Sequence, residues 1–510
     1  MTLAKVYTGA VIGLKPILVT VEVNVLARGM PSFDIVGLPS KEVDESKLRI
    51  KSAIINSKLL FPEHKIIVNL APASIPKEGS LYDLPITVGI LKATQQITAS
   101  LHQKLFMGEL SLDGEIKGIK GVAVISDLCG GKRFNYIYVP NKNKNELAFL
   151  KNSLVKSPKS LRELVNHLEG YHILFNVKPK IKVRNLIYDV LLEDIQEQEH
   201  AKRAIIIAAA GNHNIALTGP PGTGKSMLAK SMQSILPDLN EEEQNETIRI
   251  HSVADELRGN YLIRPFRFPH HTISKVGLIG GGSRIRPGEI TLAHRGILFM
   301  DEFSEFPRSV IEALRQPLED RKVVISRASG SLVFPASFSL VVANNPCPCG
   351  YLNSNIRECT CRLSDISRYR KRVSGPIWDR IDIFVTMKEF EVSKIKIDSN
   401  SNTNYGEKTR LIKDVITRAR QLQKARYETE INKTNAEQSN KSILTYMNLD
   451  SKVKELLSKS VDSLNVSPRG YFKILKVART IADLAQKEKV GEVEILEALS
   501  YRRSEEISTF

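Results

Sequence analysis

Short apolar runs alternate with helix-like runs over the first third of the chain. The runs at 17–25, 65–70 and 136–139 are rich in β-branched and aromatic residues, so they are expected to be strands. Helix-like periodicity is found at 40–56 and 84–94. This pattern predicts an α+β domain over residues 1–175. A basic, proline-containing stretch at 176–184 is expected to be a linker.

Apolar strands followed at once by polar residues are typical of the next region, 185–388. Such runs occupy 214–217, 296–300, 338–343 and 381–385, and a helix-like run at 227–236 lies between the first two. The alternation predicts an α/β fold with a parallel sheet.

From Lys408 onward the pattern is helical, with no strand signal, so 389–510 is expected to be an all-helical domain. Within it the polar, low-complexity segment 398–407 is expected to be a mobile loop.

A complete phosphate-binding loop stands between the strand at 214–217 and the helix at 227–236. Its glycines let backbone N–H groups surround phosphates, its lysine reaches the β and γ oxygens, and its serine can hold Mg²⁺. The strand–loop–helix setting is the one this motif requires, so we expect a nucleotide and Mg²⁺ to bind here. The loop is Gly219, Pro220, Pro221, Gly222, Thr223, Gly224, Lys225 and Ser226.

Polar side chains that suit hydrolysis follow the next two apolar strands. Asp301 and Glu302 end the run at 296–300, where Asp301 would orient Mg²⁺ and Glu302 would polarise the attacking water. The alternative is an acidic helix cap. Asn345 follows the run at 338–343 and precedes a proline, which holds it extended, so it is our candidate for fixing that water.

Two arginines are candidates for contact with the γ-phosphate. Arg380 precedes an alternating strand and could reach the nucleotide of a neighbouring subunit, as an arginine finger does. Arg469 lies at the start of a helix predicted at 471–486 and could contact phosphate from the helical domain. For each arginine, an ordinary surface salt bridge is the alternative.

Four of the five cysteines lie within fifteen residues of one another, in a C-x-C-x₉-C-x-C pattern. Four closely spaced thiolates favour tetrahedral Zn²⁺, and because such a site has no open position its role would be structural. Free or redox-active thiols are the alternative. The four candidate ligands are Cys347, Cys349, Cys359 and Cys361.

The charge balance favours a polyanionic partner. The net charge is +17 and the isoelectric point about 9.4, which suits nucleic acid or an anionic membrane, although a generally basic surface would give the same numbers. No apolar run is long enough to span a bilayer, and the N-terminal apolar run is broken at Lys15-Pro16. A cytoplasmic protein without a membrane partner is therefore expected.

Two turns carry arginines on flexible tips. Arg284 and Arg286 lie in a glycine-rich loop at 280–287, and Arg327 lies at the tip of a hairpin predicted at 321–335. Such arginines could contact DNA phosphates without reading bases, as movement along any sequence requires. Ordinary exposed turns are the alternative.

The order of these elements resembles that of the AAA+ ATPases, and within them most closely the magnesium-chelatase-like branch called the ComM (YifB) family. The resemblance covers nearly the whole chain. One departure is Glu197, where the family pattern D-I-x-G-Q usually has glycine near the adenine. The strings that carry the resemblance to this family are QEHAKRA (198–204), RPFRFPHH (264–271), PGEITLAHRGILFMDEF (287–303), LRQPLED (314–320), NPCPCGY (345–351), SGPIWDRIDI (374–383) and ILKVARTIADLA (474–485).

This resemblance implies a hexameric ring that hydrolyses ATP between subunits and acts as a DNA helicase in branch migration during natural transformation. Arg380 would act in trans, and Arg469 would be a second sensor, in cis or in trans. Recombination or competence proteins would be possible partners.

The stretches 65–90 and 107–128 resemble the proteolytic domain of Lon-type proteases. The nucleophile position falls on Leu81 and the lysine position near Ile125, so that domain is expected to lack peptidase activity.

Three other functions compete with a DNA motor. A magnesium-chelatase motor subunit would remodel a protein partner, but it needs neither the extra domain nor the cysteine cluster. An ATP-dependent protease would need the missing serine–lysine pair. A non-hydrolysing clamp would not need Glu302, Asn345 and Arg380.

Overall fold

The computed structural model of the chain divides it into two compact units. The first takes in Met1–Arg184 and Asn240–Tyr261, and the second Asn185–Leu239 and Leu262–Phe510. Each unit has its own sheet and its own apolar core. The described residues are 2–27, 29–130, 133–147, 150, 154–177, 188–257, 263–282, 285–327, 330–355, 357–389, 406–427, 433–447, 449–463 and 466–502.

A seven-stranded mixed sheet forms the first unit. In sheet order the strands are β3 (Ser32–Val36), β4 (Lys65–Ala71), β2 (Lys15–Leu26), β1 (Thr2–Ile12), β5 (Lys104–Phe106), β8 (Tyr136–Tyr138) and β9 (Leu154–Lys156). β1 and β2 form a long antiparallel hairpin in which Val6 faces Val21, both fully buried. β5, β8 and β9 extend the sheet in parallel beyond β1. A separate pair joins β6 (Glu109–Leu110) to β7 (Ile116–Lys117).

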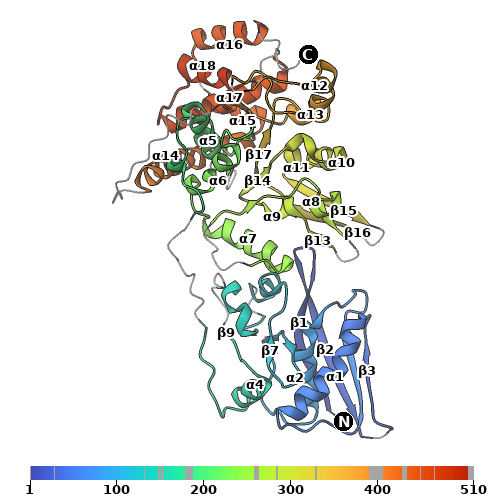
Figure 1. The fold of residues 1–510 in the computed structure, drawn as a ribbon. Coiled ribbons are helices and arrows are strands. Elements are labelled where there is room, and N and C mark those ends of the chain that lie inside the picture. Colours follow the sequence, from blue (N-terminus) through green and yellow to red (C-terminus); the bar gives the residue numbers. More distant parts are fainter. Residues whose placement is uncertain are drawn as a thin grey trace, which may run out of the picture. The chain divides into compact units, whose positions relative to one another are not determined.

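Helices pack on this sheet and close its core. They are α1 (Lys41–Asn56), α2 (Asp83–Ala93), α3 (Val122–Ile125) and α4 (Leu161–Leu168), and α7 (Glu241–Ala254) packs on α3. The Ser40 side chain caps α1 by accepting a hydrogen bond from the Val43 backbone N–H. α2 is buried against β1 and β2 (Figure 1). The helices predicted at 40–56 and 84–94 are confirmed as α1 and α2.

The segment Asn240–Tyr261 belongs to the first unit although it lies inside the range 185–388 expected for the α/β region. The reason is a set of polar contacts made by α7. The Ser252 hydroxyl donates to the Glu146 carboxylate at 2.6 Å, and its backbone carbonyl accepts from the Gly121 N–H at 3.0 Å. Arg249 Nη2 pairs with Asp127 at 2.6 Å. These contacts fix α7 where a sequence-based boundary would not place it.

A five-stranded sheet with only parallel neighbours lies at the centre of the second unit. Its order is β11 (Phe266–Arg267), β14 (Ile297–Met300), β17 (Ser339–Asn344), β10 (Ile215–Thr218) and β18 (Ile383–Thr386). Thr218 lies opposite both Asn344 and Thr386, so three strands end at the same edge of the sheet. The predicted α/β class with a parallel sheet is confirmed for this unit.

Two short hairpins and many helices complete the second unit. The hairpins pair β12 (Gly280–Gly281) with β13 (Arg286–Pro287) and β15 (Lys322–Arg327) with β16 (Gly330–Pro335). The helices are α5 (Glu199–Gly211), α6 (Lys225–Ile235), α8 (Lys275–Ile279), α9 (Glu289–Leu292), α10 (Arg308–Glu312), α11 (Arg315–Asp320), α12 (Leu363–Arg370), α13 (Gly375–Trp378), α14 (Glu407–Arg426), α15 (Asn440–Met447), α16 (Ser451–Ser463), α17 (Pro468–Leu484) and α18 (Glu492–Ser500).

The C-terminal helices share one apolar core with the sheet. α14 and α17 pack on α5, as the orange, red and green ribbons of Figure 1 show. Ile416 of α14 and Ile474 of α17 are fully buried in the same cluster as Ile215 of β10. Whether 389–510 forms a domain of its own stays a prediction.

Parts of two sequence predictions fall outside the described residues. The expected linker is described only up to residue 177, and the expected mobile loop only from Gly406. Within the described ranges, no helix is long and apolar enough to cross a membrane.

Candidate functional site

The phosphate-binding loop connects β10 to α6, as predicted. Gly222 and Gly224 have φ values of +78° and +83°, which favour glycine, and a Cβ at either position would meet nothing within 4 Å. At Gly219, by contrast, a Cβ would lie 2.9 Å from the Met387 carbonyl oxygen. The first glycine is therefore required for close packing and the other two for the backbone path.

Lys225 lies at the start of α6 with its ammonium folded back over the loop. Nζ donates to the carbonyls of Gly219 at 2.6 Å and Pro220 at 2.8 Å, and to Asn345 Oδ1 at 3.1 Å. Burial lowers the pKa of Lys225, while the carboxylates of Asp301 and Glu302 raise it. An ammonium held by neutral carbonyls can exchange them for phosphate oxygens at little cost, because phosphate offers a charged acceptor.

The two acids after β14 point to different partners. Asp301 Oδ2 accepts a hydrogen bond from Ser226 Oγ at 2.6 Å, which brings together the two side chains predicted to hold Mg²⁺. Both offer hard oxygen ligands, so the donor set fits the ion. Glu302 has a left-handed φ of +49°. Its carboxylate is exposed and lies 3.8 Å from His271 Nδ1.

The end of β17 places two asparagines in different roles. Asn345 reaches Lys225, as a residue that senses the γ-phosphate should. Asn344 is buried and holds the turn after Glu302, because its Oδ1 accepts from the Ser304 N–H at 3.0 Å and its Nδ2 donates to Ser304 Oγ at 2.8 Å. The role of Asn345 in fixing the attacking water stays a prediction.

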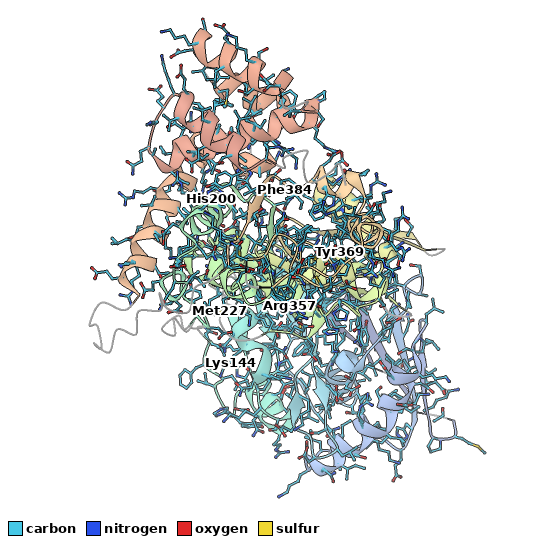
Figure 2. The ribbon with its side chains drawn as sticks, turned by 45° about the horizontal axis from the view of Figure 1, so that its top comes forward. Lys144, His200, Met227, Arg357, Tyr369 and Phe384 are labelled. Atoms are coloured by element: carbon cyan, nitrogen blue, oxygen red, sulfur yellow. The ribbon has the colours of Figure 1, made fainter. Side chains whose placement is uncertain are left out.

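A cavity of about 990 Å³ opens beside the loop at the ends of β10, β17 and β18. Its lining includes Gly219, Asn345 and three aromatic or imidazole side chains labelled in Figure 2, His200, Tyr369 and Phe384. A volume of this size, next to a phosphate loop, is adequate for a nucleotide.

Arg380 and Arg469 meet on the same carboxylate. Arg469 Nη2 donates to Glu319 Oε1 at 2.6 Å, and Arg380 Nη2 donates to Glu319 Oε2. Arg380 Nη1 also donates to the Pro376 carbonyl at 2.6 Å. The two arginines predicted separately from the sequence thus form one cluster around α11.

A second ion pair fixes the elements that carry these arginines. Lys473 Nζ, one turn after Arg469 on α17, pairs with Asp382 Oδ1 at 2.6 Å. Asp382 Oδ2 also accepts from the Asn214 N–H at 3.0 Å, and Asn214 Nδ2 donates to the Arg380 carbonyl at 2.9 Å. Burial would raise the pKa of Asp382, but the Lys473 ammonium holds it well below its usual range. The start of α17 and the backbone of Arg380 are therefore joined through buried polar groups.

The four clustered cysteines converge after β17. Their sulfurs all lie within 4.8 Å of one another, with Cys347–Cys349 at 3.4 Å, Cys349–Cys359 at 3.6 Å and Cys347–Cys359 at 3.7 Å. A tetrahedral Zn²⁺ with bonds of about 2.3 Å needs sulfurs about 3.8 Å apart. The backbone N–H of Cys349 also donates to Cys361 Sγ at 3.4 Å. The donor set and its spacing fit a closed zinc site.

The cysteine cluster contacts the phosphate loop through Gly350. Gly350 has a φ of +87°, and a Cβ there would lie 2.7 Å from Pro221 Cδ. The buried Tyr369 of α12 hydrogen bonds with Ser304 and with the backbone of Asn345, while burial raises its pKa to about 12. The loop after Asn345 is thus packed between the phosphate loop and α12.

Two of the three predicted DNA-contact residues, Arg286 and Arg327, lie on strands of the two hairpins. Arg286 is exposed on β13, and Arg327 ends β15. Arg284 lies outside the described residues, as does the side chain of Arg327. A Cβ at Gly280 would lie 3.3 Å from Ile325 Cδ1, so the two hairpins pack together, and Figure 1 shows β13, β15 and β16 on one side of the second unit.

Comparison with known proteins covers the whole chain. The chain is 40% identical over 510 residues to Competence protein ComM of Haemophilus influenzae, and the match covers 98% of each of the two chains. The chain belongs to the ComM/YifB family. The YifB proteins of Escherichia coli and Salmonella typhimurium are 39% and 38% identical, over 98% of this chain and 97% of theirs.

Three magnesium-chelatase family models match successive parts of this ComM/YifB chain. Magnesium chelatase, subunit ChlI, matches residues 191–395; Subunit ChlI of Mg-chelatase matches 21–143; and Magnesium chelatase, subunit ChlI C-terminal, matches 406–502. The Magnesium-chelatase 67 kDa subunit of Chlorobaculum parvum is 24% identical over 159 residues, which is 31% of this chain and 23% of that one. A magnesium-chelatase-like AAA+ core implies ATPase activity for this ComM/YifB chain.

Three residues of the site could not be predicted as parts of it. Glu319 lies in the LRQPLED string but carries no signal that it would meet Arg380 and Arg469. His271 ends the RPFRFPHH string, which carries no signal that this imidazole would lie beside Glu302. Gly350 follows the second cysteine, where a turn glycine is common, and only the structure shows its contact with Pro221.

Proposed function

We propose that the chain is an ATP-dependent DNA motor that works as a hexameric ring. The observation that carries this proposal is the assembly of Lys225, Ser226, Asp301, Glu302 and Asn345 around one edge of the parallel sheet. Binding alone would need the loop only, whereas a carboxylate beside the metal site and an asparagine on Lys225 suit hydrolysis.

In the proposed reaction the chain's own groups position a water against the γ-phosphate. The loop N–H groups and Lys225 hold the phosphates, while Ser226 and Asp301 hold Mg²⁺, which when bound neutralises phosphate charge. Glu302 accepts the proton of the attacking water, and Asn345 orients that water. These groups come from three neighbouring strands, so their spacing is set by the sheet.

Arg380 and Arg469 provide the argument for a ring. Both guanidiniums donate to Glu319 and neither donates to the phosphate-binding loop of the same chain within the described residues. We therefore propose that they act on the nucleotide of the next subunit. A head-to-tail contact of this kind closes into a ring when its rotation allows. Six subunits is the number implied by the AAA+ resemblance.

DNA is the polyanion we propose for the ring to move along. A net charge of +17, the exposed Arg286 on the paired hairpins, and a relative named as a competence protein support it, with Arg284 and Arg327 as further candidates from the sequence alone. A DNA substrate would place the protein in the cytoplasm, with recombination or competence proteins as partners.

The test is ATP turnover with and without single-stranded or branched DNA at low and moderate salt. Turnover stimulated severalfold by DNA, with the stimulation lost as salt rises, is the expected result. Turnover indifferent to DNA would favour the second candidate, a magnesium-chelatase-like ATPase that remodels a protein. The three chelatase models favour that candidate, while the short match to the 67 kDa subunit does not.

We propose that the first unit resembles the Lon proteolytic domain in fold and lacks its activity. Ser80 Oγ donates to the Glu109 carboxylate. Lys77 is fully buried and donates to the Pro72 carbonyl, and burial lowers its pKa. A serine next to a carboxylate, without a lysine base on its hydroxyl, is not activated as in Lon. Assembly or DNA capture remains as its role.

We propose that Cys347, Cys349, Cys359 and Cys361 hold structural Zn²⁺. Replacing Cys347 with serine should lower the zinc content from about one to near zero per chain and lower the unfolding temperature, because removing one thiolate opens the closed site. Elemental analysis and thermal unfolding measure these quantities. Cys129 is buried in the first unit and lies far from the four clustered cysteines in the sequence, so Cys129→Ser is the matched control. Unchanged metal content in Cys347→Ser would exclude the zinc assignment.

A further inference from the structure

Glu319 is a half-exposed carboxylate that engages both candidate arginines with different oxygens. Its side chain is 51% exposed, Arg469 is 43% exposed and Arg380 is 11% exposed. The cluster is therefore open to solvent on the side of Glu319 and Arg469, while the Arg380 guanidinium is set into the protein. An anion arriving from solvent can reach both guanidiniums once the carboxylate moves aside.

The two guanidiniums converge because their backbones are fixed. The buried Asp382–Lys473 pair and the Asn214–Arg380 hydrogen bond join α17 to the segment of Arg380. Arg469 lies at the second position of α17, after the Ser467 cap that accepts from the Gly470 N–H at 3.1 Å. Glu319, by contrast, lies one residue before the end of the short helix α11. The arginines are thus the better-anchored members of the cluster, and the carboxylate is the replaceable one.

The Arg380 guanidinium has hydrogen-bonding capacity that the cluster does not use. Its Nε is buried, and within the described part of the chain no acceptor reaches it. A carboxylate provides two oxygens to two guanidiniums, whereas a terminal phosphoryl group provides three and a larger charge. A phosphate in the place of Glu319 can therefore satisfy more donors than Glu319 does.

We infer that Glu319 occupies the place of a phosphate. It holds Arg380 and Arg469 together as one phosphate-binding clamp until a terminal phosphate of ATP displaces it. This inference rests on the proposed function for the identity of that phosphate. It adds that Glu319 is a positioning residue that competes with nucleotide for these two arginines.

If Glu319 competes with phosphate, removal of its charge should strengthen ATP binding, whereas removal of a merely structural group should not. Replacing Glu319 with glutamine removes the competing charge and keeps the side-chain shape. We expect the KM for ATP to fall about three- to tenfold, the range of a partly exposed charge pair, with kcat changed less than about twofold. The matched control is Asp320→Asn, which makes the same charge change at the next, exposed position of α11 and should leave KM within about twofold.

A binding measurement tests the clamp without relying on hydrolysis or DNA. The full chain carrying Lys225→Ala, which disables its own phosphate loop, is titrated with inorganic tripolyphosphate in a calorimeter at low salt. Adding Glu319→Gln should tighten binding about three- to tenfold, and adding Arg380→Ala with Arg469→Ala should abolish that gain. Circular dichroism checks that each variant is folded.

Two outcomes would overturn the inference. One is tripolyphosphate binding that Glu319→Gln leaves unchanged or weakens. The other is a gain that persists without Arg380 and Arg469, because it would then come from the net charge. Loss of DNA stimulation or of turnover would instead contradict the proposed function and leave the tripolyphosphate result standing.

Discussion

Replacing Glu302 with glutamine is expected to lower ATP turnover about 100- to 10,000-fold, the range for loss of a general base. Glutamine keeps the size and shape of the side chain but cannot accept a proton. The phosphate loop, Lys225 and the Ser226–Asp301 pair at 2.6 Å remain as they are, so ATP should still bind with nearly its original affinity. Phosphate release measures the first quantity, and equilibrium binding of labelled ATP measures the second.

A matched control for Glu302 lies three residues along the chain. Glu305 is exposed and pairs with Arg372 at 2.6 Å, so Glu305→Gln makes the same chemical change away from Asp301. It should change turnover less than about threefold, as exposed pairs contribute little. Glu302→Gln turning over at the rate of the unmodified chain would remove Glu302 from the proposed reaction, and loss of ATP binding would mean that its role is structural.

Replacing Arg380 with alanine is expected to lower turnover about 1,000-fold or more, as removal of an arginine finger does. The guanidinium would stabilise the charge that spreads over the phosphate oxygens in the transition state. Because Arg380 lies on Glu319 and not on the loop of its own chain, the loss should occur at the neighbour's site. ATP affinity should change far less than turnover.

Mixing two inactive variants distinguishes action in trans from action in cis. Arg380→Ala chains keep an intact phosphate loop, and Lys225→Ala chains keep an intact Arg380. In an equal mixture, about a quarter of head-to-tail interfaces would contain both intact parts, so turnover should reappear. Each variant alone at the same total concentration is the control. A mixture as inactive as its components would place Arg380 in cis or outside the site.

The arrangement of the candidate nucleotide site could be predicted from the sequence because its signals are local. The glycine-rich loop and the acids after an apolar run each indicate where a strand ends, to within a few residues. The parallel sheet then brings those strand ends together. Lys225, Asp301 and Asn345 all meet at this edge. The strands around them were likewise predictable to within a residue or two, because the runs at 296–300 and 338–343 are apolar except for Gly296 and Ser339.

Other features depend on contacts between distant parts of the chain. Glu319 meets Arg469 across 150 positions, and no short pattern encodes that pairing. α7 joins the first unit through Ser252 and Glu146, although its sequence lies between elements of the second. β1 was missed because small or polar residues such as Ala4, Thr8 and Ala10 fill its buried face, which weakens the apolar signal.

The central claim, that ATP hydrolysis drives movement on DNA, is tested most directly by strand displacement. Forked and three-stranded DNA with one labelled strand are incubated with the full chain and ATP, and the displaced strand is measured over time, with Glu302→Gln as the control. The account predicts displacement by the unmodified chain and none by Glu302→Gln or without ATP. ATP turnover without displacement on any of these substrates, and indifferent to DNA, would contradict it and favour a protein-remodelling ATPase.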